Sequence, residues 1–288
     1  GLETMKQVMA SQLPDGPQAE QITLAFDMYG QMFRFCRAEI DVVAIGIRTD
    51  GDGNMRIGER FHFRPEGKLA KLPAGKGSSP TELLRGLPAD DYVFVGGAVL
   101  SPKLTEAMMQ WSLGLMQSNS KLYGLEEISD AQMEKLIETS MASMKGIEAM
   151  GFRMAPGKVG EPIYSNLLFT MRMPDSSQFL ANYRKYIAAW NEMTRDAKEG
   201  GFAMKFDVAD ATIAGREALR MTMDMRGVMV AQAQGNPEAA KILEPMVDKL
   251  FGADGKMKIT LVQVDATTVA SGIGSVSQMT RAVERMLS

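Results

Sequence analysis

Hydrophobic and polar residues alternate from Ile163 to Met173, and the period then changes to that of a helix. Every second side chain of the first part would face a core, as in a strand with one buried face. Pro174 would end this strand, and Asp175 or Ser176 is suited to cap a helix that follows it. The next apolar positions form one helical stripe: Phe179, Tyr183, Ile187 and Trp190. A strand that leads into a capped amphipathic helix is therefore the predicted building block.

Two looser copies of this unit lie on either side of it. Residues 92–100 predict a strand that a helix follows, and Gly96 and Gly97 stand at its centre. Glycines in a strand predict the close approach of a helix or a ligand. Near the end of the chain, a hairpin over 257–272 precedes a final amphipathic helix.

Further hairpins and one more capped helix are predicted. Residues 40–49 are apolar on both sides, which is typical of an interior strand, and 55–64 form its predicted hairpin partner. Ser129 and Gln132 have the spacing of a capping box for a helix that reaches about Met150. In another hairpin the returning strand alternates through a row of apolar residues: Leu219, Met221, Met223 and Met225.

The order of these elements predicts the fold class. Strands joined mainly by hairpins, with helices between them, indicate an α+β fold with mainly antiparallel sheet and amphipathic helices layered on a face. Hairpin and strand–helix patterns occur once before the loop at 155–162 and again after it. The pattern thus predicts two similar halves, residues 1–157 and 158–288, and leaves open whether they pack as one continuous domain.

Methionine supplies much of the apolar material, with 25 Met against 12 Phe, 6 Tyr and 2 Trp. The main interpretation is a Met-filled core, because flexible thioethers fill irregular gaps. A Met-lined cavity for an apolar ligand is the alternative. Copper(I) binding is disfavoured because residues such as Met144 and Met221 lie on apparent core faces. No cofactor is predicted.

The formal net charge of −3 gives no general attraction to nucleic acid, and we expect no nucleic-acid partner. No apolar run approaches the roughly 18 to 20 residues that span a bilayer, so no transmembrane segment is expected. The chain starts with Gly1 rather than Met, as a processed or trimmed product does, and a tag remnant or a removed export signal would each leave this start. Cys36 is the single cysteine, which excludes an internal disulfide.

No catalytic constellation is recognisable. His62 is the single histidine, which excludes zinc sites built from several histidines and every serine triad that does not use it. We therefore expect no enzyme. An unrecognised hydrolase stays open, and it would need acids of perturbed pKa clustered in a cleft.

One set of basic residues lies along the predicted strand 55–64. Alternation puts its basic side chains on one face, and Arg48 joins them from the neighbouring strand in one register of the hairpin. This candidate anion- or partner-binding surface, the basic strip, consists of Arg48, Arg56, Arg60, His62 and Arg64. It would bind an acidic polymer or an acidic protein partner, and a solvated strand face is the plainer interpretation.

Residues 87–93 (LPADDYV) lead into a predicted strand, and residues 268–275 (TVASGIGS) close another before a helix. Both stretches resemble a group of uncharacterised extracytoplasmic bacterial proteins that carry a domain of unknown function built from repeated hairpin and strand–helix units. The resemblance implies an exported protein without known activity, and it supplies no catalytic residues.

These features predict a non-enzymatic extracytoplasmic binding or structural module, periplasmic or secreted, whose ligand the sequence does not identify. Two alternatives accompany this prediction. The first is a carrier of an apolar ligand in a Met-lined cavity, and the second is an unrecognised hydrolase.

Overall fold

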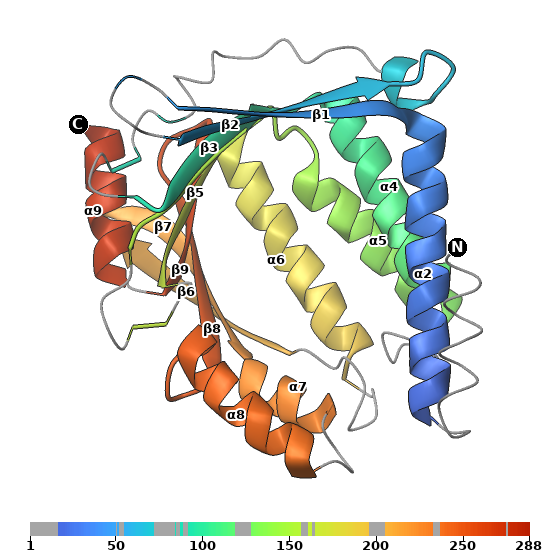
Figure 1. Ribbon diagram of the computed structural model, residues 1–288. Coiled ribbons are helices and arrows are strands. Elements are labelled where there is room, and N and C mark those ends of the chain that lie inside the picture. The colour runs from blue at the N-terminus through green and yellow to red at the C-terminus, as the bar shows by residue number, and fades with distance from the viewer. Residues whose placement is uncertain are drawn as a thin grey trace. The chain divides into compact units, whose positions relative to one another are not determined.

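The computed structural model describes residues 17–49, 51, 55–71, 84, 87–88, 92–118, 128–156, 161–162, 165–195, 205–232, 237–274 and 276–288. The chain divides into two compact units, one of residues 1–74 with 114–122 and one of residues 75–113 with 123–288. The first unit contains helix α2 (Pro17–Glu39) and the hairpin of β1 (Ile40–Thr49) and β2 (Met55–Phe63). The second contains a seven-stranded sheet (Figure 1).

In the first unit, a buried carboxylate connects the end of α2 to the chain that follows β2. Glu39 ends α2 and is 5% exposed. Its Oε2 accepts a hydrogen bond of 2.7 Å from the backbone N–H of Leu69, which begins the short 3₁₀ helix η1 (Leu69–Lys71). Its backbone oxygen accepts another, of 2.8 Å, from the N–H of Arg64. The chain that follows β2 is thereby attached to the junction of α2 and β1.

Residues 40–49 do form a strand, but the prediction of an interior strand was wrong. Within the described chain β1 belongs to a sheet of two strands, β1 and β2, which pair in antiparallel register. Ile45 and Ile47 are 65% and 66% exposed. An apolar run indicates burial on both faces only in a strand that has neighbours on both sides and layers packed on both faces. In the described ladder β1 has one neighbouring strand, β2.

All seven strands of the second unit are antiparallel, in the order β3-β4-β5-β9-β8-β7-β6. The strands are β3 (Phe94–Val99), β4 (Ala149–Met154), β5 (Asn166–Arg172), β6 (Phe206–Ile213), β7 (Arg216–Asp224), β8 (Lys256–Gln263) and β9 (Thr268–Gly274). The predicted α+β fold with mainly antiparallel sheet is confirmed. The predicted boundary at 157/158 falls between β4 and β5, which are neighbours in this sheet.

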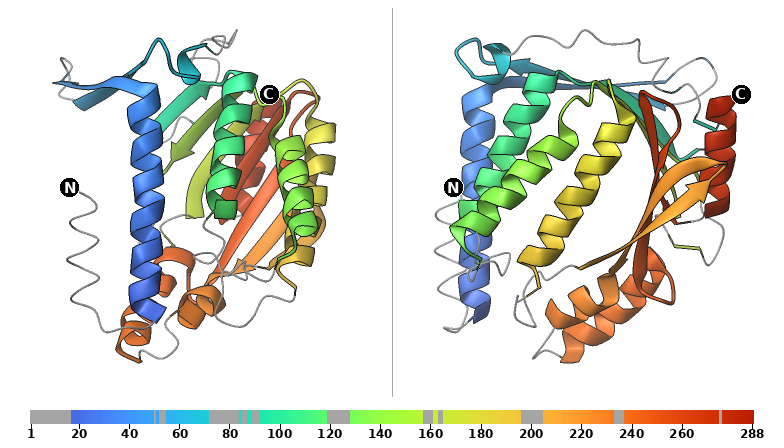
Figure 2. Two further views of the ribbon diagram at one scale, coloured as in Figure 1. Left: turned by 90° about the vertical axis from the view of Figure 1, so that its right-hand side faces the viewer. Right: turned by 180° about the vertical axis from the view of Figure 1, so that it is seen from behind.

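Helices cover both faces of this sheet rather than one (Figure 2). The helices of the chain after β3 are α4 (Pro102–Ser118), α5 (Asp130–Met144), α6 (Ser176–Met193), α7 (Met225–Gln232), α8 (Pro237–Phe251) and α9 (Val276–Leu287). On one face α6 buries Phe179, Leu180 and Ile187 against the sheet, and α5 packs on α6. On the other face α9 buries Met279 and Val283. Two core clusters therefore lie on either side of one sheet.

The predicted strand–helix unit is present as β5 and α6. Asp175 caps α6, because its Oδ1 accepts a hydrogen bond of 2.9 Å from the N–H of Gln178. This bond, and a second from the hydroxyl of Ser177, hold the pKa of Asp175 below its ordinary value. Phe179 and Ile187 of the predicted stripe are buried, and Tyr183 packs beside them.

Two of the predicted elements differ at their ends. Helix α5 stops at Met144, and residues up to Met150 are not helical as predicted, because β4 begins at Ala149. Gly146 breaks the helical path with a φ of +87°. Met225 does not continue the alternation of β7 but begins α7, so its apolar side chain belongs to a helix.

The space over Gly96 of β3 is filled by a side chain rather than by a helix. A Cβ at Gly96 would lie 2.5 Å from Cζ of Phe152, the residue opposite it on β4. The ring of Phe152 therefore packs directly on the backbone of β3, and glycine permits this approach. No ligand is needed to explain Gly96.

The capping box of α5 gives a test of local structure. Ser129 Oγ accepts a hydrogen bond from the N–H of Gln132, and the Gln132 side chain accepts one from the N–H of Ser129, as predicted. We expect Ser129→Ala to lower the free energy of unfolding by about 1 kcal/mol, measured by urea denaturation. Ser129→Thr keeps the hydroxyl and is the control. An equal loss in both variants would contradict the role of the cap.

Candidate functional site

A pocket of about 370 Å³ on the α9 side of the sheet brings together three arginines. It lies between β4, β5 and α9, and we call it the arginine pocket. Arg153 comes from β4, and Arg281 and Arg285 come from α9. None of the described residues that line it is acidic. The pocket is therefore lined by concentrated positive charge.

Strand alternation fixes the buried member of this set. Ala149, Gly151 and Arg153 share the buried side of β4. Arg153 is 4% exposed and stands between Val95 of β3 and Leu168 of β5, so pairing on both sides holds its backbone. Arginine is almost never this deeply buried unless it is paired.

Helical spacing presents the other two arginines. Arg281 and Arg285 are four residues apart on α9, so their side chains leave the same face of the helix. Both are exposed, whereas Met279, Ala282 and Val283 pack on the sheet. Arg281 and Arg285 are therefore the exposed arginines of the pocket lining, and Arg153 is the buried one.

Two amides fix the walls of the arginine pocket. Asn166 is buried at the start of β5, and its Nδ2 donates a hydrogen bond of 3.1 Å to the backbone oxygen of Pro156. Its Oδ1 accepts a hydrogen bond from Nε2 of Gln278 in the first turn of α9. The loop after β4, the start of β5 and the start of α9 are thus tied together through one side chain.

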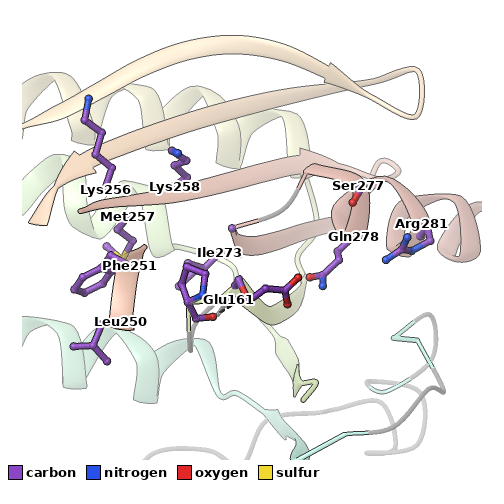
Figure 3. Close-up of a pocket in the computed structure, with 13 residues that line it drawn as sticks. Glu161, Leu250, Phe251, Lys256, Met257, Lys258, Ile273, Ser277, Gln278 and Arg281 are labelled. Carbon is purple, nitrogen blue, oxygen red and sulfur yellow. Dashed lines mark hydrogen bonds between the residues drawn. The ribbon is translucent and has the colours of Figure 1, made fainter. Parts of the chain in front are cut away.

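A second cavity, of about 410 Å³, adjoins the arginine pocket and shares Gln278 and Arg281 with it. We call it the apolar cavity. Half-buried apolar side chains form one part of its lining: Pro162, Leu250, Phe251, Met257 and Ile273. In Figure 3, Leu250, Phe251 and Met257 gather at one end, and Gln278 and Arg281 lie at the other. Lys256 lies near Met257 in the same view, so the apolar side chains form one cluster within a lining that also carries charge.

Charged groups at the rim of the apolar cavity are partly paired. Nζ of Lys258 forms an ion pair with Asp254. The hydrogen bond from Lys258 holds the pKa of the Asp254 carboxyl below its ordinary value, so this acid is ionised at neutral pH. Glu161 and Lys256 are exposed and also border the cavity.

A third cavity, of about 310 Å³, lies between α4 and α5 and has methionines in its lining. Met109, Met141 and Met144 contribute the thioethers, and Lys103 and Lys145 are nearby. We call it the methionine pocket. It offers a second place for the apolar ligand that the methionine content suggested. Other methionines fill the cores instead, among them Met173, Met193, Met221, Met223 and Met279.

The register of the first unit places four positions of the basic strip on one face of the β1–β2 ladder. Arg48 stands opposite Arg56, and positions 60 and 62 stand opposite positions 44 and 42. Residues that pair directly share a face, and so do residues two apart along a strand. The side chains of Arg48, Arg56 and Arg60 lie outside the part of the chain that the structure describes. Anion binding by the strip stays a prediction.

Arg64, the fifth member, lies beyond the end of β2. Its Nε donates a hydrogen bond of 2.8 Å to the backbone oxygen of Arg37. Its guanidinium nitrogens lie 3.8 Å from a carboxylate oxygen of Asp41 and 3.9 Å from one of Glu66. These contacts give Arg64 a structural role at the end of α2.

The sequence did not predict the arginine pocket. Arg281 and Arg285 carried a local signal, since their spacing puts both on one helix face. Arg153 carried none, because it fell just after a helix that was predicted to reach Met150. Its place on a buried strand face depends on pairing with β3 and β5.

Within the described residues, no helix has the length and apolar character needed to cross a membrane. The described part of the chain also holds no cluster of three or more His, Cys, Asp or Glu side chains suited to a metal ion. In comparisons with known proteins, no family model, no curated protein and no solved structure matches this chain.

Proposed function

We propose that this chain is a non-enzymatic binding module that takes a small anion, a carboxylate or a phosphate, in the arginine pocket. The observation that carries the proposal is the convergence of Arg153, Arg281 and Arg285 on one cavity of about 370 Å³. Cavities of about 300–1,000 Å³ with a few convergent polar groups are the usual binding sites for small molecules. The resemblance of residues 87–93 and 268–275 supports a place outside the cytoplasm for this module.

The chemistry of guanidinium favours these anions. Arginine offers several N–H donors in a planar fork that matches two oxygens of a carboxylate or phosphate. Such charge-assisted hydrogen bonds contribute about 1.5–3 kcal/mol each. The amides of Asn166 and Gln278 are fixed by their own hydrogen bond, so the walls around the anion are already in place before binding.

Calorimetric titration with inorganic phosphate and with acetate tests the proposal. We expect Arg281→Gln and Arg285→Gln each to weaken binding about tenfold or more, because each removes a charged donor. Arg195→Gln removes the same charge from an exposed position just after α6, on the other side of the sheet, and is the matched control. Absence of binding by the wild type, or equal affinity in all variants, would contradict the proposal.

An acidic polymer or acidic protein partner on the basic strip is the second candidate. Its support is the register that places positions 48, 56, 60 and 62 on one face. Titration with polyglutamate separates the two candidates. Binding to the strip would be unchanged by Arg285→Gln and would weaken with salt, whereas binding at the arginine pocket would weaken about tenfold or more with that substitution.

A further inference from the structure

The arginine pocket and the apolar cavity are neighbours with a common wall. Gln278 and Arg281 line both of them. The two side chains come from the first half of α9, whose position is fixed by the hydrogen bond between Gln278 and Asn166. Arg281 therefore adjoins both spaces, and a ligand that contacts this side chain stands at the boundary between them.

Several side chains that line the apolar cavity have apolar surface that a ligand would remove from water. Leu250 and Phe251 end α8, Met257 lies on β8 and Ile273 lies on β9, and each is only half buried. Apolar surface removed from water stabilises a complex in proportion to its area. A hydrocarbon chain is the chemical group that fits this end of the cavity.

The distribution of charge sets the direction of such a ligand. The apolar cavity is bordered by the cations Lys256 and Lys258 and by the acid Glu161, and Lys258 is paired with Asp254, so its positive charge is partly offset. The arginine pocket contributes Arg153 and Arg285 besides the shared Arg281, and no acid among its described lining residues. An anionic group is therefore more stable in the arginine pocket than in the apolar cavity.

We infer that the anion carries an apolar chain: its charged group lies in the arginine pocket and its chain in the apolar cavity. The ligand class is an alkyl carboxylate or another amphipathic anion of similar shape. The inference rests on the proposed function, because it uses the same three arginines for the charged group. It goes further by naming the second half of the ligand.

Affinity across a series of carboxylates tests the inference. The probes are acetate, hexanoate and decanoate, each below the concentration at which it self-associates, with decanol as the uncharged comparison. Each buried methylene strengthens binding by up to about fourfold. We expect the dissociation constant of the wild type to fall by about tenfold or more from acetate to decanoate. Decanol is expected to bind more weakly than decanoate.

Substitutions separate the two halves of the site. Phe251→Ala and Met257→Ala are expected to reduce the increase in affinity from acetate to decanoate. The affinity for acetate should stay unchanged in both variants. Arg285→Gln is expected to weaken all three acids by a similar factor. Met109→Ala truncates a side chain of the methionine pocket and is the control. A cooperative thermal unfolding transition shows that each variant is folded. If Phe251→Ala does not fold, Leu250→Ala takes its place.

The outcomes distinguish this inference from the proposed function. Equal affinity for acetate and decanoate would overturn the inference and leave anion binding intact. Equal affinity for decanol and decanoate would overturn it as well, since the charge would then play no part. A loss of decanoate binding in Met109→Ala but not in Phe251→Ala would overturn the inference, because the alkyl chain of the ligand would then bind in the methionine pocket. Binding of none of the acids would remove the proposed function itself.

Discussion

Leu180→Ala is expected to lower the free energy of unfolding of the seven-stranded unit by about 3 kcal/mol, within a range of roughly 2–5 kcal/mol. Leu180 lies on α6, is 1% exposed and packs in the core between α6 and the sheet. Truncation removes buried methyl groups and leaves a cavity, and the loss includes both contributions. Urea denaturation followed by far-ultraviolet circular dichroism measures it, and the dependence on urea concentration should stay unchanged.

Leu287→Ala is the matched control for this prediction. The chemical change is identical, but Leu287 ends α9 and is 40% exposed. We expect a loss of about 0.5 kcal/mol or less, as for surface positions in general. Similar losses in the two variants would show that α6 does not pack on the sheet as described.

Helix α6 was predictable from the sequence because its signals are local. The capping residue Asp175 and the stripe through Phe179 and Ile187 lie within one short segment. Periodicity within such a segment states which side faces a core. The antiparallel class of the sheet followed in the same way from hairpins between neighbouring strands.

The order of the strands could not be predicted, since it depends on pairing between distant segments. β5 and β9 are neighbours although the hairpin of β6 and β7 and strand β8 lie between them in sequence. The pairing of β9 with β5 joins β3, β4 and β5 to β8, β7 and β6 in one sheet, and α9 covers the face opposite α6. Apolar patterns alone do not state which strand stands beside which.

The candidate site was hidden for the same reason. Arg153 and Arg281 meet only because β4, β5 and α9 come together, and each arginine alone looks like a surface residue in the sequence. The basic strip was predicted because its members lie on one hairpin, where alternation is sufficient. Local patterns therefore favour sites built within one hairpin over sites built between elements.

Gly274→Ala is expected to cost about 3 kcal/mol of stability, because two effects act at this position. Gly274 has a φ of +103°, a conformation that side-chain-bearing residues adopt only at a cost of about 1–3 kcal/mol. A Cβ there would also lie 2.6 Å from Cα and 2.9 Å from the backbone oxygen of Ser165. Both are main-chain atoms, so the start of β5 would have to move.

Gly215→Ala isolates the first of the two effects. Gly215 lies in the turn between β6 and β7 with a φ of +73°, and a Cβ there would meet no atom within 4 Å. We expect a loss of about 1 kcal/mol, from conformation alone. Urea denaturation of both variants measures the difference, and equal losses would mean that Ser165 does not approach Gly274. Ser165 and Gly274 both line the apolar cavity, so a displaced Ser165 should also weaken decanoate binding in Gly274→Ala but not in Gly215→Ala.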